Sequence, residues 1–219
     1  MSRTVVSGKL WPMGRWEPDA RRRMQEAALE LFGERGYART TAAEVAERAG
    51  LTERTFFRHF PDKREVLFAD DGMRALLAAA VAAAPEGAEP IEAISSGLEA
   101  VAVELQGRRE TAARRARIIG AHAELQEREL KKLASWSDAL ERVLRGRGLS
   151  GSDARLAAEV AVAVFRVAYG RWLEEGTERE LVAIVRDALA GVGNLISHSA
   201  PGQRDVPAHP GPTAHQGDL

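Results

Sequence analysis

The stretch TTAAEVAERAGLTERTFFRHF, residues 40–60, predicts two short helices joined by a tight turn. Thr41 is followed three residues later by Glu44, which is the spacing of a capping box at the start of a helix. Gly50 ends that helix, and a second helix follows at about residues 53–60. An apolar period before residue 36 predicts one more helix, so the segment has the spacing of a helix-turn-helix motif.

The second helix of this pair has two chemically different faces. A period of about 100° per residue places Phe56 and Phe60 on one side, where they can pack against the preceding helices. Arg54 and Arg58 fall on the opposite side. Because arginine makes paired hydrogen bonds to guanine edges, this face is typical of a helix that reads the major groove of DNA. The alternative is that both arginines are simply solvated.

Polar groups at neighbouring helix ends extend this surface. Thr40, Thr41 and Lys63 lie near helix N-termini, where a hydroxyl, backbone amides or an ammonium can hold a phosphate. The sequence therefore places candidate phosphate contacts on both sides of the candidate reading helix.

The rest of the chain also has helical periodicity and lacks the alternation of strands, so we predict an all-α fold of about nine helices. Asp62 and Glu65 have the spacing of a second capping box and predict a long helix to about residue 81. Prolines between residues 85 and 90 mark a break. The last two helices are expected at about 153–175 and 177–198, where small apolar residues form wide faces.

Composition excludes several classes of function. The formal net charge of −1 argues against a protein that coats nucleic acid by charge alone. The chain has no cysteine, which excludes disulfides and thiolate chemistry. Phosphate-binding glycine loops, metal-binding histidine motifs and catalytic constellations are absent from the sequence, so we expect no enzyme, no cofactor and no metal. Apolar runs shorter than ~18 residues and the lack of a signal peptide predict a cytoplasmic protein with no membrane partner.

Residues 27–68 contain three motifs in order: A-x-x-L-F-x-x-x-G-Y, T-T-x-x-x-V-A-x-x-A-G-L-T and T-F-F-R-H-F-x-x-K. This combination resembles the DNA-binding segment of the tetracycline-repressor (TetR/AcrR) family of transcriptional regulators. With the helix-end positions above, the resemblance gives as candidate DNA contacts Thr40, Thr41, Thr52, Arg54, Thr55, Phe57, Arg58, His59 and Lys63. The family usually has tyrosine where this chain has Phe57, so a hydroxyl that would bind phosphate is missing.

Composition and the resemblance together predict a division of the chain. A flexible arm (1–18) would precede the helix-turn-helix domain (19–69), and a ligand-binding and dimerisation domain (70–199) would precede a proline-rich disordered tail (200–219). Residues 108–148 resemble the C-terminal domain of mycofactocin-type regulators, some of which respond to acyl-CoA. By the same resemblance, the last two helices would pair with those of a second subunit; the alternative is that their apolar faces fill the core of a monomer.

Two groups of side chains are candidates for contact with an effector. Aromatic residues could line an apolar cavity, although each could equally be part of the core, and they are Trp136, Phe165, Tyr169 and Trp172. Arginines could meet the phosphates of CoA or form a solvated helix face, and they are Arg108, Arg109, Arg114, Arg115 and Arg117.

These observations predict a homodimeric, ligand-responsive repressor. It would bind a palindromic operator in double-stranded DNA through the helix at about 53–60. A small effector, an acyl-CoA or another hydrophobic compound, would release it. The alternative is a helical small-molecule-binding protein or enzyme that keeps the helix-turn-helix as a scaffold.

Overall fold

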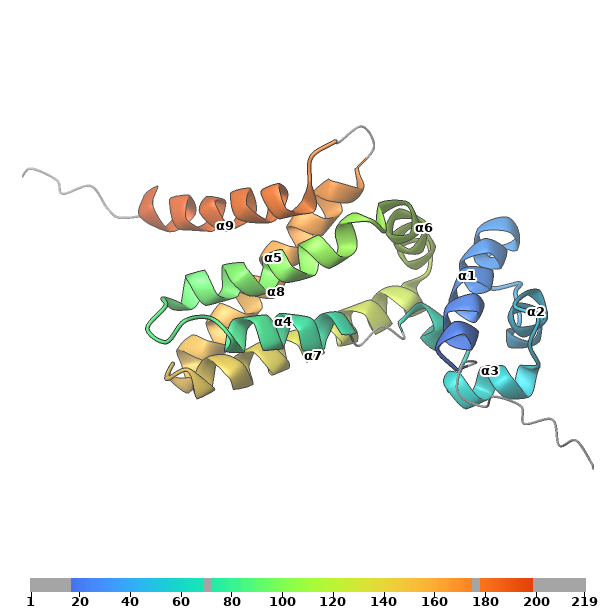
Figure 1. Cartoon of the computed structure of the whole chain (residues 1–219). Helices are drawn as coiled ribbons and strands as arrows, with labels where there is room; N and C mark the ends of the chain where they lie inside the picture. Colours follow the sequence, from blue (N-terminus) through green and yellow to red (C-terminus); the bar gives the residue numbers. More distant parts are fainter. Residues whose placement is uncertain (1–16, 69–71, 175–177, 199–219) are drawn as a thin grey trace, which may run out of the picture.

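The computed structural model describes residues 17–68, 72–174 and 178–198, and over these ranges it contains nine α-helices, one 3-10 turn and no strand. The prediction of an all-α fold of about nine helices is confirmed. The helices form two bodies, a small one of α1, α2 and α3 and a longer one of α4, α5, α7, α8 and α9 (Figure 1). Helix α6 lies between the two bodies (Figure 1). The expected arm and tail fall almost wholly outside the described residues.

The small body is built on one apolar core. Its helices are α1 (Glu17–Arg35), α2 (Ala42–Arg48) and α3 (Glu53–His59). The face predicted for α1, which includes Met24, Leu31 and Phe32, is buried in that core. Phe56 and Phe60 complete this core from the α3 side, so the burial of their rings fixes the orientation of α3 against α1 and α2.

The prediction of one long helix from Asp62 to about residue 81 is wrong. The Asp62 carboxylate accepts hydrogen bonds from the backbone N–H groups of Arg64 and Glu65, but it caps only the 3-10 turn η1 (Arg64–Leu67). Val66, Leu67 and Phe68 are all buried. Three consecutive buried residues do not fit one face of a helix at about 100° per residue, so the chain turns here instead.

The long body packs its helices around a second core. Helices α4 and α7 run side by side along it, while α5 and α9 cover the other side and α8 crosses between (Figure 1). A Cβ at Gly97 would lie 2.5 Å from Cγ2 of Val81, so only glycine permits the close approach of α4 and α5. The bounds are α4 (Gly72–Ala82), α5 (Pro90–Gln106), α6 (Arg109–Gly120), α7 (Ala123–Gly146), α8 (Gly151–Leu173) and α9 (Leu181–His198).

The two cores are joined through α6 and the start of α7. Ile118 and Ile119 of α6 and Leu125 of α7 are buried in the core of the small body. Side chains from α6 and α7 therefore complete the packing of the helix-turn-helix. A movement of α6 would act directly on that packing.

Candidate DNA-binding surface and effector region

The turn between α2 and α3 depends on a glycine. Gly50 has a φ of 68°, a left-handed conformation that is costly for other residues. A Cβ at this position would also lie 2.7 Å from an Arg23 guanidinium nitrogen. That guanidinium donates a hydrogen bond to the carbonyl of Ala49 and so holds the turn against α1. The predicted turn is confirmed, with φ and close packing as its physical reasons.

Helix α3 begins at a threonine cap. The Thr52 side chain accepts a hydrogen bond from the Thr55 backbone N–H at 3.2 Å, and the two hydroxyl oxygens lie 3.0 Å apart. Both hydroxyls therefore lie together at the N-terminus of α3. That end carries the positive pole of the helix dipole, which favours a phosphate.

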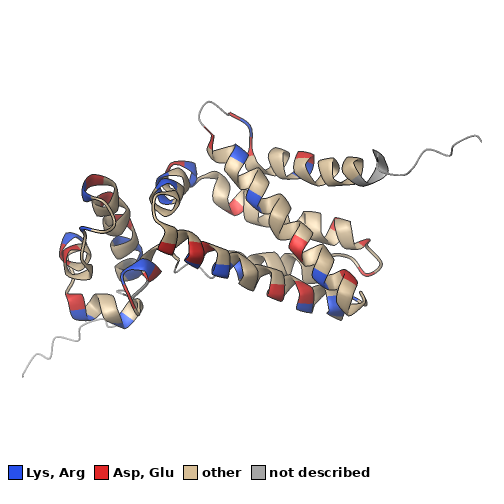
Figure 2. Cartoon of the chain, turned by 180° about the vertical axis from the view of Figure 1, so that it is seen from behind, with Lys and Arg blue, Asp and Glu red and all other residues tan. Residues whose placement is uncertain are grey.

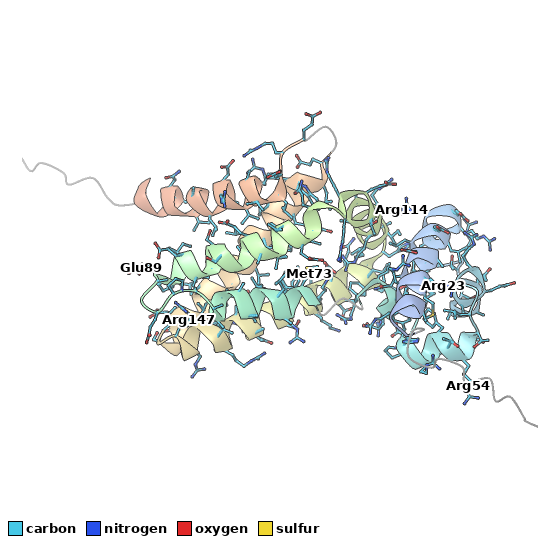
Figure 3. All side chains as sticks on the ribbon, viewed as in Figure 1. Arg23, Arg54, Met73, Glu89, Arg114 and Arg147 are labelled. Atoms are coloured by element: carbon cyan, nitrogen blue, oxygen red, sulfur yellow. The ribbon has the colours of Figure 1, made fainter. Side chains whose placement is uncertain are left out.

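The two predicted faces of α3 are confirmed. The rings of Phe56 and Phe60 are buried with their centroids 5.1 Å apart. Arg54 and Arg58 are exposed on the other side, and Figure 3 shows Arg54 pointing away from the body. Phe57 leaves half of its surface exposed, at 50%. Helix α3 therefore packs against the small body with one face and exposes the opposite face, as expected for a helix that binds a DNA groove.

Two of the nine candidate DNA contacts donate side-chain hydrogen bonds to backbone carbonyls within the small body. The Thr40 side chain is only 1% exposed, and its hydroxyl donates to the carbonyl of Gly36 at 3.0 Å, so its prediction as a DNA contact is wrong. The Lys63 ammonium donates to the carbonyls of Tyr37 and Thr40 at 2.7 and 2.9 Å. It also lies 4.1 Å from the centroid of the Tyr37 ring. Lys63 therefore fastens the α1–α2 loop to the chain after α3, a role that the sequence did not indicate.

The two remaining candidates differ in exposure. Thr41 is exposed and forms the predicted capping box, in which its hydroxyl and backbone N–H both bond to the Glu44 carboxylate. His59 is partly buried beside Phe60, with ring centroids 6.3 Å apart. Among the candidate contacts, Thr41, Thr52, Arg54, Phe57 and Arg58 are thus exposed, and Thr55 and His59 are partly buried.

The four predicted effector residues form one continuous row. Trp136 of α7 lies against Phe165 of α8 with centroids 5.1 Å apart. Phe165 stacks on Tyr169 at 5.6 Å, and Tyr169 contacts Trp172 at 5.8 Å. We call these four side chains the aromatic row. The four side chains lie together, and their role toward an effector stays a prediction.

Two polar atoms near this row are buried without a hydrogen-bond partner. They are Nε1 of Trp172 and Oγ of Ser137, both in side chains with 0% exposure. A buried donor without an acceptor costs about 1–3 kcal/mol, so such atoms in a core call for an explanation. A ligand that supplies acceptors would remove that cost.

A set of charges around Phe68 connects the row to the turn after α3. Arg128 of α7 binds Glu65 of η1 through two hydrogen bonds of 2.6 and 2.8 Å. Two guanidiniums lie over the Phe68 ring, that of Arg115 at 5.1 Å and that of Arg128 at 4.9 Å from its centroid. Arg115 of α6 also donates to the carbonyl of Leu67 at 2.7 Å. We call Glu65, Phe68, Arg115, Arg128 and Glu129 the Phe68 clasp.

The clasp extends to the aromatic row through Arg115. Arg115 binds the Glu129 carboxylate at 2.6 Å. Burial acts to raise the pKa of Glu129, but the charge and hydrogen bond of Arg115 outweigh it and hold that pKa below its usual value. Burial raises the pKa of Tyr169, and a hydrogen bond with Arg115 offsets part of that rise. Arg115 therefore contacts the row on one side and η1 on the other.

Most of the Phe68 clasp could not be predicted from the sequence. Glu65 was expected only as a helix cap, and Phe68, Arg128 and Glu129 had no assigned role. Their pairing spans 63 residues between Glu65 and Arg128, and no local spacing reveals a contact at that separation. The charged run from Glu127 to Glu129 is visible in the sequence but does not reveal its partners.

The five arginines proposed for CoA phosphates do not form one cluster. Arg108 and Arg114 pair with glutamates four residues before them, Glu104 and Glu110. Arg109 donates to the carbonyls of Trp172 and Glu174 at the end of α8. With Arg115 in the clasp, only Arg117 has no ion-pair or hydrogen-bond partner for its side chain among the residues described.

In the described part of the chain, no group of three or more histidine, aspartate or glutamate side chains is arranged to hold a metal ion. None of the helices in this part combines the length and apolar character needed to cross a membrane.

Comparison with known proteins assigns the two parts of the chain. Residues 26–69 match the family of bacterial regulatory proteins called the tetR family. Residues 88–196 match the MftR C-terminal domain. The chain thus belongs to the tetR family of transcriptional regulators and has an MftR-type C-terminal domain.

Individual relatives agree with this assignment. The transcriptional regulator TcmR of Streptomyces glaucescens is 40% identical over 75 residues, which cover 34% of this chain and a third, 33%, of TcmR. The SmeT–triclosan complex, from the Stenotrophomonas maltophilia regulator, has a TM-score of 0.57 at 24% identity over 78% of this chain and 90% of SmeT. Bacillus subtilis FadR with stearoyl-CoA has a TM-score of 0.56 at 18% identity over 77% and 95%. At these identities the structural likeness concerns the fold.

Proposed function

We propose that this protein is a homodimeric transcriptional repressor whose hold on operator DNA is controlled by a small, largely apolar effector. One observation carries the proposal: α3 is fixed from behind by buried Phe56 and Phe60 and presents Arg54 and Arg58 to solvent. A short, rigidly seated helix with two exposed guanidiniums suits the major groove and guanine edges. The surrounding hydroxyls of Thr41 and the α3 cap suit the phosphates beside it.

The dimer is supported by an exposed apolar stripe on α8. Its members recur at intervals of four and three residues and are Leu156, Val160, Ala163, Val167 and Gly170, of which Val160 is partly buried. Leu156 and Val167 are 66% and 54% exposed, and Leu195 on α9 is 73% exposed. Figure 2 shows few charged residues along α9. Large exposed apolar side chains on adjacent helices indicate an interface, and a two-fold pair of α8 and α9 would give a four-helix contact.

The effector would bind at the aromatic row. Its four rings offer apolar and stacking contacts, and the unpartnered Nε1 of Trp172 offers a donor. SmeT is known in complex with triclosan and FadR with stearoyl-CoA, so ligands with a large apolar part are accommodated by this fold. We therefore assign this chain an apolar effector that carries a hydrogen-bond acceptor. An acyl-CoA is one member of that class.

Release of DNA would follow from the Phe68 clasp. Two α3 helices must lie about 34 Å apart to enter successive major grooves of a palindrome. An effector that displaces Tyr169 would disturb Arg115, and Arg115 holds η1 through Leu67 and Phe68. Since η1 is the next element after α3, a disturbance of η1 would alter the orientation of α3, the helix proposed to read DNA. A ligand that prefers the altered arrangement shifts the population away from DNA.

The proposal is tested by selecting genomic DNA fragments that bind the purified protein. We expect recovery of a palindromic sequence, which Arg54→Ala should bind with about 1–3 kcal/mol less free energy while its binding to random DNA changes little. Arg145→Ala, an exposed arginine on α7 far from α3, is the matched control. Failure to select any sequence at low salt would contradict the proposal.

A helical binding protein or enzyme that retains the helix-turn-helix as a scaffold is the competing class. Catalytic turnover of a bound small molecule, together with no DNA binding in the selection, would favour it. The homologues named above are transcriptional regulators, which favours the DNA-binding function.

A further inference from the structure

A groove lies between the C-terminal end of α1 and helix α6, where the two bodies meet. Its volume is about 290 Å³, near the lower limit for small-molecule sites, which often occur at domain junctions. Figure 3 shows Arg114 at the end of α1 opposite to Arg54, so the groove lies away from the DNA-reading face. The lining residues are Phe32, Gly33, Gly36, Arg114, Arg117, Ile118, Ala121 and His122.

The charge of this groove has one sign. Two arginines, Arg114 and Arg117, line it, and no carboxylate is among its lining residues. The side chain of Arg117 has no ion-pair or hydrogen-bond partner within the described ranges, unlike the other four arginines of its segment. Arg114 pairs only with Glu110, whose side chain is 87% exposed, and such surface pairs exchange readily for a better partner.

The base of the groove is apolar and open. Phe32 of α1 and Ile118 of α6 are buried beneath it. A Cβ at Gly33 would meet no atom within 4 Å, so space is available directly above the backbone of α1. An apolar base with a cationic rim is complementary to a small molecule that has an apolar body and one anionic group.

We propose that this groove is a second ligand site, which binds a small amphipathic anion bearing a carboxylate or a phosphate. The guanidiniums of Arg117 and Arg114 hold the anionic group through charge-assisted hydrogen bonds, and the apolar body lies over Gly33 between Phe32 and Ile118. The site is separate from the aromatic row and goes beyond the effector control proposed above. Because the ligand contacts both bodies, its binding is linked to their relative orientation.

The test is calorimetric titration of the full-length protein with three probes of one shape. Phenylacetate and phenyl phosphate carry the two anionic groups, and phenylacetamide is the neutral counterpart. We expect at least one anion to bind about tenfold or more tightly than the amide, which corresponds to the loss of one charge-assisted bond. Phenylacetate and phenyl phosphate together distinguish a carboxylate site from a phosphate site. No heat from either anion below about 10 mM, or equal binding of the amide, would overturn the proposal.

Two variants place the binding in the groove. Arg117→Gln removes the unpartnered charge, and Gly33→Leu fills the space above α1 without meeting another atom at its Cβ. Both should weaken anion binding about tenfold, and Arg145→Gln, an exposed arginine on α7, should leave it unchanged. Thermal unfolding verifies that each variant is folded. Unchanged binding in both groove variants would refute the site, as would displacement of the anion by random-sequence duplex DNA.

Because the titration is made on the protein without operator, its failure leaves the repressor function untouched. Failure to select DNA would likewise leave this binding site intact. The two proposals are therefore tested independently.

Discussion

Lys63 is a structural residue of the helix-turn-helix. Its ammonium donates to two backbone carbonyls, those of Tyr37 and Thr40, and a charged donor makes each bond worth about 1.5–3 kcal/mol. Lys63→Met keeps the aliphatic stem but leaves both carbonyls without this donor. We expect it to lower the free energy of unfolding by about 2 kcal/mol in urea titrations of the full chain.

The matched control for Lys63 is another basic residue of the same body. Arg58→Met removes an exposed cation, so its effect on unfolding should stay within about 0.5 kcal/mol while DNA binding weakens. If the two variants were equally stable, the structural role given to Lys63 would be wrong.

The Tyr37 phenol makes the small body sensitive to alkali. Burial, and then the nearby Glu124 carboxylate, raise the pKa of Tyr37 to about 12 from an ordinary value near 10. Below pH 10 the phenol is protonated in both folded and unfolded states, so its contribution to stability is complete. Between pH 10 and 12 only the unfolded state releases the proton, and the free energy of unfolding falls.

Urea unfolding from pH 8 to about 11 measures this fall, which should reach roughly 1–2 kcal/mol at the upper end. Tyr37→Phe removes the phenol but keeps the backbone carbonyl that binds Lys63, so its loss of stability should be smaller. Lys63 and Glu124 also face Tyr37, and both remain in this variant. Parallel pH profiles for the two proteins would contradict the assignment.

At the scale of the helix, α8 carries the proposed subunit contact. Leu156→Glu places a charge in the exposed stripe, where the desolvation of an unpaired carboxylate opposes association. We expect the variant to be monomeric by light scattering and to bind palindromic DNA at least about tenfold more weakly, because two linked reading helices are lost. Ile91→Glu on α5, a change at another half-exposed apolar residue, should remain dimeric. A dimeric Leu156→Glu protein would place the interface elsewhere.

Helices with local signals could be predicted from the sequence, and elements set by distant contacts could not. The faces of α3 follow from period alone, because Phe56 and Phe60 are four residues apart, and the cap of α2 follows from Thr41 and Glu44. The break after Leu67 does not follow from any local signal. The capping signal at Asp62 is real, yet Phe68 turns toward Arg115 and Arg128, which lie more than forty residues further along the chain.

The candidate site divides in the same way. Exposure of Arg54 and Arg58 follows from the helical period of one short segment. The structural roles of Thr40 and Lys63 could not be predicted, because a polar residue near a helix end can either face solvent or bond to carbonyls within the fold. The path of the α1–α2 loop decides between these two possibilities. In this protein, carbonyls of that loop accept hydrogen bonds from the side chains of both Thr40 and Lys63.

At the scale of the whole molecule, the Phe68 clasp links the two bodies. Glu65 of η1 and Arg128 of α7 form a partly buried two-bond pair, and pairs of this kind give measurable coupling in double-mutant cycles. We expect Glu65→Gln and Arg128→Gln each to change the operator dissociation constant. The double variant should differ from the sum of the singles by about 1 kcal/mol or more. The pair Arg155 and Asp138, which lies within the longer body, should give no coupling in DNA binding. Additive effects at Glu65 and Arg128 would show that the clasp does not orient α3.

The burial of Ile118, Ile119 and Leu125 in the small body has a consequence for protein engineering. A DNA-binding module cut from this chain near residue 69 would expose an apolar hollow, so it should not melt as an independent unit. A chimera that grafts its reading helix onto another sensor must carry complementary side chains from the start of α6 to the start of α7. DNA-binding modules can therefore be exchanged between such regulators only if the side chains that fill their cores fit together. A junction chosen only by sequence position would give an unstable hybrid.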